Sequence, residues 1–445
     1  MGRRAHSRAL DVWANGVFVG QWRVLPQGTD ELLYDAGWAA SPSGRPLSLS
    51  LPIPLDRRPV KGGAVRNFFD NLLPDSDRIR QRLQARFRTP GTGAFDLLAA
   101  IGRDCVGAVQ LLPEGESPAD VRRIEAELLG EDDVERILLG TVAAPGALGR
   151  AADDEDFRIS IAGAQEKTAL LWHDRRWCRP LGATPTTHIF KLPLGVVGNR
   201  QADMRTSVEN EWLCTELLRA FGLPVAPCRI ARFGGQKVLI VERFDRRLAE
   251  GGYWLRLPQE DFCQACGIRP DAKYEADGGP GLKEIADILA NSEHRDADLR
   301  TLLQAQLLFW LLAATDGHAK NFSIHLLPQG RYQLTPLYDV LSAWPVIGKG
   351  AGRLDYKKLK LAMALRGKSK HYKLDEIQRR HFDSTARACG YGPGMQDLVE
   401  EILARAESVL DEVAGRLPAG FPGDVFEAIA LGMKWSAARL AAMKP

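Results

Sequence analysis

The stretch "LAATDGHAKNFSIH", residues 312–325, places polar side chains between an apolar, helix-like run and an alternating, strand-like one. Asp316 and Asn321 are separated by four residues, which is the spacing that protein kinases use in their catalytic loop. There the carboxylate orients the hydroxyl that is phosphorylated, and the asparagine holds a metal ion. Because Asp, Gly and Asn also form turns, this spacing alone fits a tight turn equally well.

A second acidic residue, Asp339 in "LTPLYDV", follows two short runs that alternate as the strands of a hairpin do. A hairpin returns the chain to its starting point, so we expect Asp339 to lie beside Asn321. Mg²⁺ prefers hard oxygen ligands, commonly one or two carboxylates with phosphates and water. The pair therefore predicts a Mg²⁺ site, and a helix N-cap or a surface acid is the alternative for Asp339.

A cation for phosphate groups is available in "HIFKLP", where Lys191 interrupts an apolar strand in which a lysine is costly. Its place is like that of the lysine in the V-A-I-K strand of kinases. The next helix offers Glu209 and Glu211, which are two residues apart and so do not share a helical face. We predict that Glu211 pairs with Lys191 and that Glu209 is a solvated acid.

The segment "SIAGAQEK", residues 160–167, joins two strand-like runs with small residues, which let backbone N–H groups approach anionic oxygens. It has one glycine, so a plain hairpin turn is the alternative. The predicted nucleotide contacts of this phosphate loop are Ile161, Ala162, Gly163, Ala164 and the side chain of Lys167.

Further candidates lie where a kinase hinge would offer backbone groups to adenine, in "VLIVERFDR", residues 238–246. These are Glu242, Arg243 and Phe244, with a simple linker as the alternative. Within the catalytic loop we add His318, as a buttress, and Lys320, as a cation that neutralises transferred phosphate. Spacing supports neither of these last two roles.

The elements that must position these residues belong to a chain of 445 residues, which predicts two or three domains. The net charge of +3 is too balanced for nucleic-acid binding by the whole chain. Residues 353–381 nevertheless hold ten basic and three acidic residues, which fits either a solvated face or a DNA contact. The longest apolar run, about 307–314, is far short of the ~18 residues that span a bilayer. We therefore expect a soluble, cytoplasmic protein without membrane contact.

The order of the elements suggests an N-terminal domain and two lobes. The first domain has a helix starting near Ser76, the connector has a helix over 117–140, and a strand leads into the phosphate loop. The helix over 207–222 is amphipathic and ends at Gly222. After residue 246 we expect helices and a single hairpin. The predicted parts are a small α/β domain at 1–112, a connector at 113–155, a β-rich lobe at 156–245 and a mostly helical lobe at 246–445. This is an α+β, bilobal layout like that of protein kinases.

Several motifs in this order together resemble the HipA family of serine/threonine kinase toxins. They include "FFDNLLPDS", "SIAGAQEKTALL", "PTTHIFKLP", "VERFDRR", "KYEADGGPG", "ATDGHAKNFS" and "LTPLYDV". The resemblance covers nearly the whole chain and is less clear at 113–155 and after 381.

The resemblance implies an ATP- and Mg²⁺-dependent protein kinase that is the toxin of a toxin–antitoxin pair. It implies a small dimeric helix-turn-helix antitoxin as partner, a complex that binds operator DNA and represses it, and glutamyl-tRNA synthetase as substrate. It also implies that Asp316 is the catalytic base, that Asn321 and Asp339 bind metal, that Lys191 binds ATP phosphate, and that Ser160 is autophosphorylated. The alternatives are a DNA-bound co-repressor with vestigial kinase activity and a small-molecule phosphotransferase.

Overall fold

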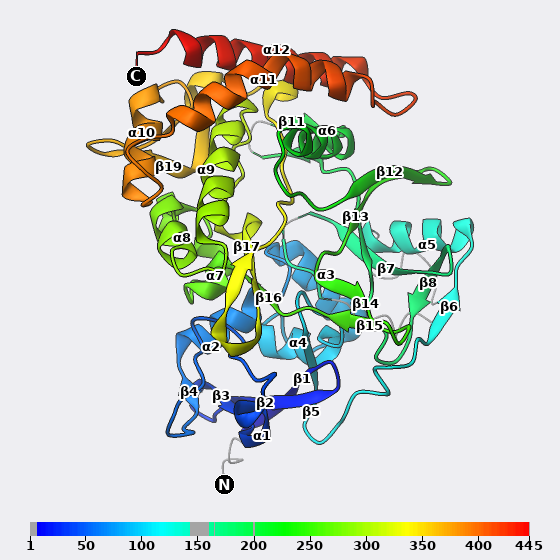
Figure 1. Ribbon diagram of the computed structural model, residues 1–445. Coiled ribbons are helices and arrows are strands. Elements are labelled where there is room, and N and C mark those ends of the chain that lie inside the picture. Colours follow the sequence, from blue (N-terminus) through cyan, green and yellow to red (C-terminus); the bar gives the residue numbers. More distant parts are fainter. Residues whose placement is uncertain (1–6, 143–159, 164, 199–200, 445) are drawn as a thin grey trace.

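A computed structural model of the chain describes residues 7–142, 160–163, 165–198 and 201–444. The buried apolar side chains form three clusters, which correspond to an N-terminal domain, a β-rich lobe and a helical lobe. In Figure 1 the N-terminal domain lies at the bottom, the β-rich lobe at the right and the helical lobe at the upper left. The arrangement is the predicted α+β fold with two lobes and a preceding domain.

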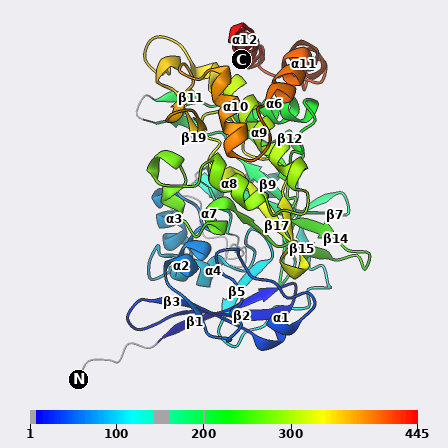
Figure 2. The same ribbon diagram turned by 60° about the vertical axis from the view of Figure 1, so that its left-hand side comes forward.

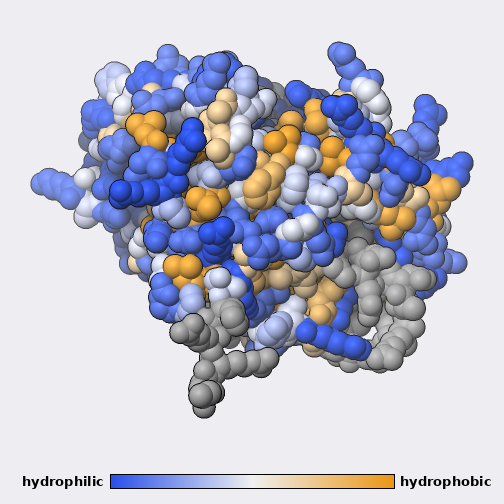
Figure 3. Space-filling model, turned by 90° about the horizontal axis from the view of Figure 1, so that it is seen from below, coloured by the Kyte–Doolittle hydropathy of each residue, from blue (hydrophilic) through white to orange (hydrophobic). Residues whose placement is uncertain are grey.

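The N-terminal domain is an antiparallel sheet of order β4-β3-β2-β1-β5 packed against helices. Trp22 of β2 stacks on Phe69 of α2 with ring centroids 4.1 Å apart, so that the sheet and its helices bury one apolar core. The face seen in Figure 3 is mostly hydrophilic, with scattered apolar side chains. The elements are β1 (Arg8–Ala14), β2 (Val17–Val24), β3 (Asp30–Tyr34), α1 (Ala36–Ala40), β4 (Val60–Lys61), α2 (Gly63–Asp70), α3 (Asp77–Phe87), α4 (Ala94–Ile101) and β5 (Val109–Pro113). Helix α3 begins after Ser76, as predicted.

The β-rich lobe is a six-stranded antiparallel sheet of order β12-β13-β9-β7-β8-β6. Its elements are β6 (Ala126–Leu128), α5 (Glu131–Val142), β7 (Lys167–His173), β8 (Arg176–Pro180), β9 (His188–Lys191), β10 (Gly195–Val197), β11 (Ala202–Met204), α6 (Ser207–Ala220), β12 (Cys228–Phe233) and β13 (Gln236–Glu242). Strand β9 lies in the middle of this sheet, between β7 and β13, and carries Lys191 at its end.

One prediction for this lobe was wrong. The helix predicted over 117–140 covers only its second half, because Ala126–Leu128 forms an edge strand on β8 and tertiary pairing outweighs local propensity. The expected connector thus contributes β6 and α5 to the lobe. The strand expected before the phosphate loop falls on residues that lie outside the described ranges, and residues 160–163, which follow it, run beside residues 71–75.

Helix α6 is buried on all sides, whereas the sequence predicted an amphipathic helix with one solvated face. Every residue of the helix except Arg219 is buried, so it has no solvated face. It packs between the sheet and α11 (Gln396–Ala414) of the helical lobe. Gly222, at φ +90°, lies just beyond the helix, where the left-handed backbone favours glycine.

The helical lobe surrounds α9, whose apolar residues from Leu299 onward are buried on all sides. It holds three small sheets where one hairpin was predicted, because β14–β15 and β19–β20 form hairpins and β16 adds to β17–β18. The remaining elements are β14 (Arg246–Leu248), β15 (Trp254–Arg256), β16 (Gln259–Asp261), α7 (Phe262–Ala265), α8 (Leu282–Leu289), α9 (Arg295–Leu311), β17 (Ser323–Leu326), β18 (Tyr332–Leu334), β19 (Lys360–Arg366), β20 (Lys370–Lys373), α10 (Arg379–Ala388) and α12 (Gly423–Ala442). None of the helices in the described ranges is long and apolar enough to cross a membrane.

The N-terminal domain contacts both lobes. Helix α2 packs against α7 of the helical lobe, and Figure 2 shows the two side by side. Pro74, between α2 and α3, forms a parallel bridge with Gly163 of the phosphate loop. The domain therefore lies directly under the residues predicted to bind nucleotide.

Candidate active site

Lys191 is the centre of a buried group of charges. Its ammonium group donates to Glu211 Oε1 of α6 at 2.6 Å and to Asp339 Oδ1 at 2.8 Å. Burial acts to lower the pKa of Lys191, but Asp339 and Glu211 outweigh this and raise it, so the lysine stays charged. The predicted ion pair with Glu211 is present.

Glu209 points away from Lys191, because residues two positions apart on a helix, such as Glu209 and Glu211, do not share a face. Its carboxylate pairs with Lys237 of β13. The prediction of a solvated acid was wrong, because the closely packed surroundings of α6 bury Glu209 as well as Glu211.

Lys167 lies directly opposite Lys191 in the antiparallel pairing of β7 with β9. Facing residues on neighbouring strands point to the same side, and two like charges placed so are destabilising. The Lys167 ammonium lies against the phosphate loop, since a Cβ on Gly163 would be 2.5 Å from Nζ. Burial lowers the pKa of Lys167 to about 8, with Asp339 opposing this effect and Lys191 adding to it. Two neighbouring lysines beside a glycine-containing loop are suited to holding an anion.

The phosphate loop is held by the N-terminal domain. Ser160 is fully buried, its hydroxyl donates to the Leu72 carbonyl oxygen at 2.7 Å, and its N–H donates to the Asp104 carbonyl oxygen at 3.1 Å. Ile161 is also buried. Gly163 has φ +111°, a conformation that other residues rarely adopt.

Two further loop residues were predicted to contact nucleotide. Ala162 is half-buried between Ile161 and Gly163. Ala164 lies outside the described residues.

The catalytic loop follows α9, as predicted. Asp316 is exposed, with 58% of its side-chain surface accessible, and its Oδ1 accepts a hydrogen bond from the Tyr274 hydroxyl. Burial, followed by the charge and hydrogen bond of Asp316, raises the pKa of Tyr274, which therefore remains a donor. One carboxylate oxygen of Asp316 is thus oriented while the side chain stays open to a substrate.

His318 and Lys320 are both buried in this loop. The His318 ring packs edge-on against Tyr274, and burial lowers its pKa to about 4, so it is neutral at pH 7. The Lys320 ammonium donates to Asp75 Oδ1 at 2.9 Å and to Asn71 Oδ1 at 3.0 Å. The Lys320 ammonium therefore bonds to residues of the N-terminal domain. The predicted role was neutralisation of transferred phosphate, which differs from this contact.

Asn321 and Asp339 are brought together, as the hairpin prediction required. Asn321 Nδ2 donates to the Asp339 carbonyl oxygen at 3.0 Å, which fixes the orientation of the amide. Burial acts to raise the pKa of the Asp339 carboxyl, but Lys191 and then Lys167 outweigh it and keep the group ionised. Asp339 retains 33% side-chain exposure, so its carboxylate remains reachable.

These two residues fit the ligands that Mg²⁺ takes from a protein, an amide oxygen and a carboxylate. Within the described ranges, no three or more His, Cys, Asp or Glu side chains gather into a metal cage. A site of two oxygen donors suits an ion that also coordinates phosphate oxygens and water, which is the usual manner for Mg²⁺.

The predicted hinge lies at the end of β13. The N–H of Glu242 donates to the Pro227 carbonyl oxygen at 2.8 Å, and that of Arg243 donates to the Thr187 carbonyl oxygen at 2.9 Å. Both N–H donors are therefore already used within the protein, and the contact of this segment with adenine stays a prediction. Phe244 is half-buried and packs against Tyr338 at 5.6 Å between ring centroids, which leaves it as an apolar wall.

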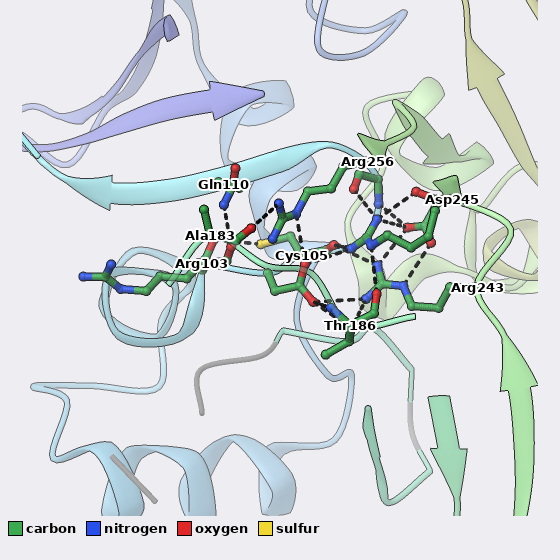
Figure 4. Close-up of polar contacts among 12 residues, drawn as sticks. Arg103, Cys105, Gln110, Ala183, Thr186, Arg243, Asp245 and Arg256 are labelled. Atoms are coloured by element: carbon green, nitrogen blue, oxygen red, sulfur yellow. Dashed lines mark hydrogen bonds and ion pairs between the residues drawn. The ribbon is translucent and has the colours of Figure 1, made fainter. Parts of the chain in front are cut away.

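The Arg243 side chain belongs to a buried charge network that joins the N-terminal domain, the β-rich lobe and the helical lobe. Asp104 of the N-terminal domain accepts from Arg246 at 3.0 Å and from Arg256 at 3.1 Å, and Arg243 binds Asp245 at 2.8 Å. Figure 4 shows Arg243, Asp245 and Arg256 converging there. Burial acts to raise the pKa of Asp104, but the three arginines outweigh it and hold it well below its usual range.

Comparisons with known proteins identify the family of this chain. Residues 159–413 match the model of the HipA-like C-terminal domain, and residues 10–139 match that of the HipA N-terminal domain. The chain is 34% identical over 389 residues to the protein Y4mE of Sinorhizobium fredii, with 86% of each chain covered. The chain belongs to the HipA family.

Other HipA relatives include a serine/threonine-protein kinase toxin HipA of Shewanella oneidensis, 31% identical over 323 residues and 69% of each chain. A solved structure of HipA from this organism, described as a complex with HipB and operator DNA, matches with a TM-score of 0.78. The two chains are 23% identical over 98% of each. This likeness confirms the predicted fold class.

Three polar residues around this HipA-family site were not found from the sequence. Tyr274, Asp75 and Asp104 lie in distant segments and follow no spacing rule that links them to the catalytic loop. Tyr274 and Asp75 do occur within the motifs "KYEADGGPG" and "FFDNLLPDS". Those motifs were the available signal, but they assign no role to either residue.

Proposed function

We propose that this HipA-family protein transfers the γ-phosphoryl group of ATP to a serine or threonine hydroxyl of a protein, with Mg²⁺ as cofactor. The observation that carries the proposal is the pair of facing lysines, Lys167 and Lys191, of which Lys191 is bound to Glu211 and Asp339. A buried lysine held by a helix glutamate beside a metal-binding aspartate is the arrangement that kinases use.

The residues of the chain have distinct tasks in this reaction. Lys191 and Lys167 bind phosphate oxygens, and the loop around Gly163 brings its backbone close to them. Asp316 orients the substrate hydroxyl and takes its proton, while Tyr274 fixes one of its oxygens. Asn321 and Asp339 would hold Mg²⁺, which would neutralise charge on the phosphates.

The toxin role follows from the family. A relative is named a kinase toxin, and a solved relative is described with HipB and operator DNA. We accordingly propose a small helix-turn-helix antitoxin as partner, operator binding and repression by the complex, and glutamyl-tRNA synthetase as substrate. The basic segment at residues 353–381 supports a DNA contact, because several of its basic side chains are exposed. These are Arg353, Lys357, Lys358, Lys360, Lys368, Lys370 and Arg380.

Autophosphorylation at Ser160 requires a rearrangement. The hydroxyl is fully buried and donates to Leu72, so residues 160–163 must leave the N-terminal domain before Ser160 can react. A phosphate would add about −1.5 to −2 charges and could not return to a site beside a carbonyl oxygen. We propose that the phosphorylated protein is inactive.

The test is transfer of labelled phosphate from ATP to glutamyl-tRNA synthetase and to the protein itself. We expect transfer by the parent, loss of transfer with Asp316→Ala, and loss of self-labelling with Ser160→Ala. Asp203→Ala, at an exposed ion pair with Arg205, is the matched control and retains activity. No transfer by the folded parent would favour the co-repressor, and transfer to a small molecule instead would favour a small-molecule phosphotransferase.

A further inference from the structure

Asp75 of the N-terminal domain contacts two loops and a third segment of the candidate active site. Its N–H donates to the Gly163 carbonyl oxygen of the phosphate loop at 3.0 Å. Its Oδ1 accepts from Lys320 of the catalytic loop at 2.9 Å, and its Oδ2 accepts from Lys273 at 3.0 Å. One residue from outside the two lobes therefore bonds to three segments that must be arranged together.

The contact with Lys273 reaches the proposed base. Lys273 immediately precedes Tyr274, whose hydroxyl donates to Asp316 Oδ1. Lys320 reaches the same loop from its other end, one residue before Asn321. Asp75 thus bonds directly to one end of the catalytic loop and reaches the other end through Lys273 and Tyr274, although it touches none of the reacting atoms.

Neighbouring residues reinforce this contact. Asn71 Oδ1 accepts from Lys320 at 3.0 Å, and the Leu72 carbonyl oxygen accepts from the Ser160 hydroxyl at 2.7 Å. Pro74 forms the bridge with Gly163. Residues 71–75, the sequence "NLLPD", form a continuous strip beneath the phosphate and catalytic loops.

The charges explain why this carboxylate matters. Asp75 has 11% side-chain exposure and faces two ammonium groups that are also buried, with 14% exposure for Lys273 and 4% for Lys320. Burial acts to raise the pKa of Asp75, but Lys320 and then Lys273 outweigh it and lower it. Without the carboxylate, two buried cations lose the group that they share, and their repulsion separates the segments that carry them.

We propose that Asp75 is a positioning residue that fixes the catalytic loop relative to the phosphate loop. This inference rests on the proposed kinase function. The side chain and the backbone of Asp75 have separable effects, because the carboxylate holds the catalytic loop while the N–H holds the phosphate loop. Removal of the carboxylate alone therefore lowers kcat more than it raises KM for ATP.

The experiment compares Asp75→Asn with the parent in labelled phosphate transfer and, without nucleotide, in amide hydrogen exchange. We expect kcat to fall about 100-fold, the cost of a displaced catalytic group. Exchange should accelerate at His318 and Asn321, whose N–H groups bond within the loop to the carbonyl oxygens of Asp316 and His318. The control is Asp96→Asn, which removes the partner of Arg8 in the same domain and should change neither measurement.

A second variant keeps the test decisive if Asp75→Asn does not fold by circular dichroism. Lys273→Gln removes one of the two cations and leaves the bond between Asp75 and Lys320. It should lower kcat relative to the parent and should accelerate exchange at His318.

The outcomes separate this inference from the proposed function. Unchanged kcat and unchanged exchange in every variant that folds would overturn the positioning role. Faster exchange in the variants of a parent that transfers no phosphate would support the positioning role and reject the proposed kinase function. A rise in KM with kcat unchanged would also overturn the inference, since it would place the effect in the phosphate loop alone.

Discussion

Raising the pH from 7 to 9 is expected to weaken ATP binding by neutralising Lys167. Burial lowers the pKa of this lysine from 10.5 to about 8 in the protein without nucleotide. An ordinary lysine would remain charged over this interval. Because the folded pKa is the lower one, the charge is lost as the pH rises through about 8.

The size of the effect follows from this value. With a pKa of about 8, the charged fraction of Lys167 falls from about 0.9 at pH 7 to about 0.1 at pH 9. If phosphate binds only the charged form, the apparent Kd for ATP rises about tenfold, mostly above pH 8. The same linkage requires that binding above pH 8 take up a proton.

The assay is calorimetric titration with a non-hydrolysable ATP analogue across this range, in two buffers of different ionisation enthalpy. Proton uptake then appears as a buffer-dependent heat. Lys167→Arg is the control, because arginine stays charged and should flatten the pH dependence. The role of Lys167 would be refuted if the affinity of the parent did not change between pH 7 and 9. It would also be refuted if the affinity of Lys167→Arg changed with pH as steeply as that of the parent.

Two further substitutions test the loop and the interdomain network. Gly163→Ala should cost about 1–3 kcal/mol of stability because of its positive φ, and it should also weaken ATP binding by displacing the Lys167 ammonium. Gly28→Ala, at φ +83° with open space around it, should cost similar stability in thermal unfolding and leave ATP binding unchanged. Asp104→Asn should cost about 3–5 kcal/mol in urea unfolding, since it leaves buried arginines without their partner. The exposed Asp203→Asn should show no measurable loss, and equal midpoints for the two asparagine variants would contradict this reasoning.

The parts of the site that lie on one regular element could be predicted from the sequence. The two-residue offset of Glu209 and Glu211 predicted that they do not share a helical face, and in the structure Glu211 alone of the two pairs with Lys191. The hairpin that returns Asp339 to Asn321 could also be predicted, because alternating runs and a turn define it in the sequence. In both cases local geometry determines the contact.

The remainder depends on packing between distant segments. The burial of Ser160 and the bonds of Lys320 come from residues 71–75, which no periodicity connects to them. The arrangement of Lys167 opposite Lys191 requires the strand pairing, which the order of strands in the sequence does not supply. The prediction of a solvated Glu209 failed for the same reason, since the helix packs on the sheet and Lys237 of β13 pairs with this carboxylate.

The pairing of β7 with β9 limits how this chain can vary in length. Side chains alternate between the two faces of a sheet, so one residue inserted or deleted within β7 would turn Lys167 away from Lys191. A slip of one position would place Thr168 opposite Lys191 instead. Side chains along this strand can therefore be exchanged more readily than residues can be added or removed, and among related chains the length of β7 is expected to vary less than its composition.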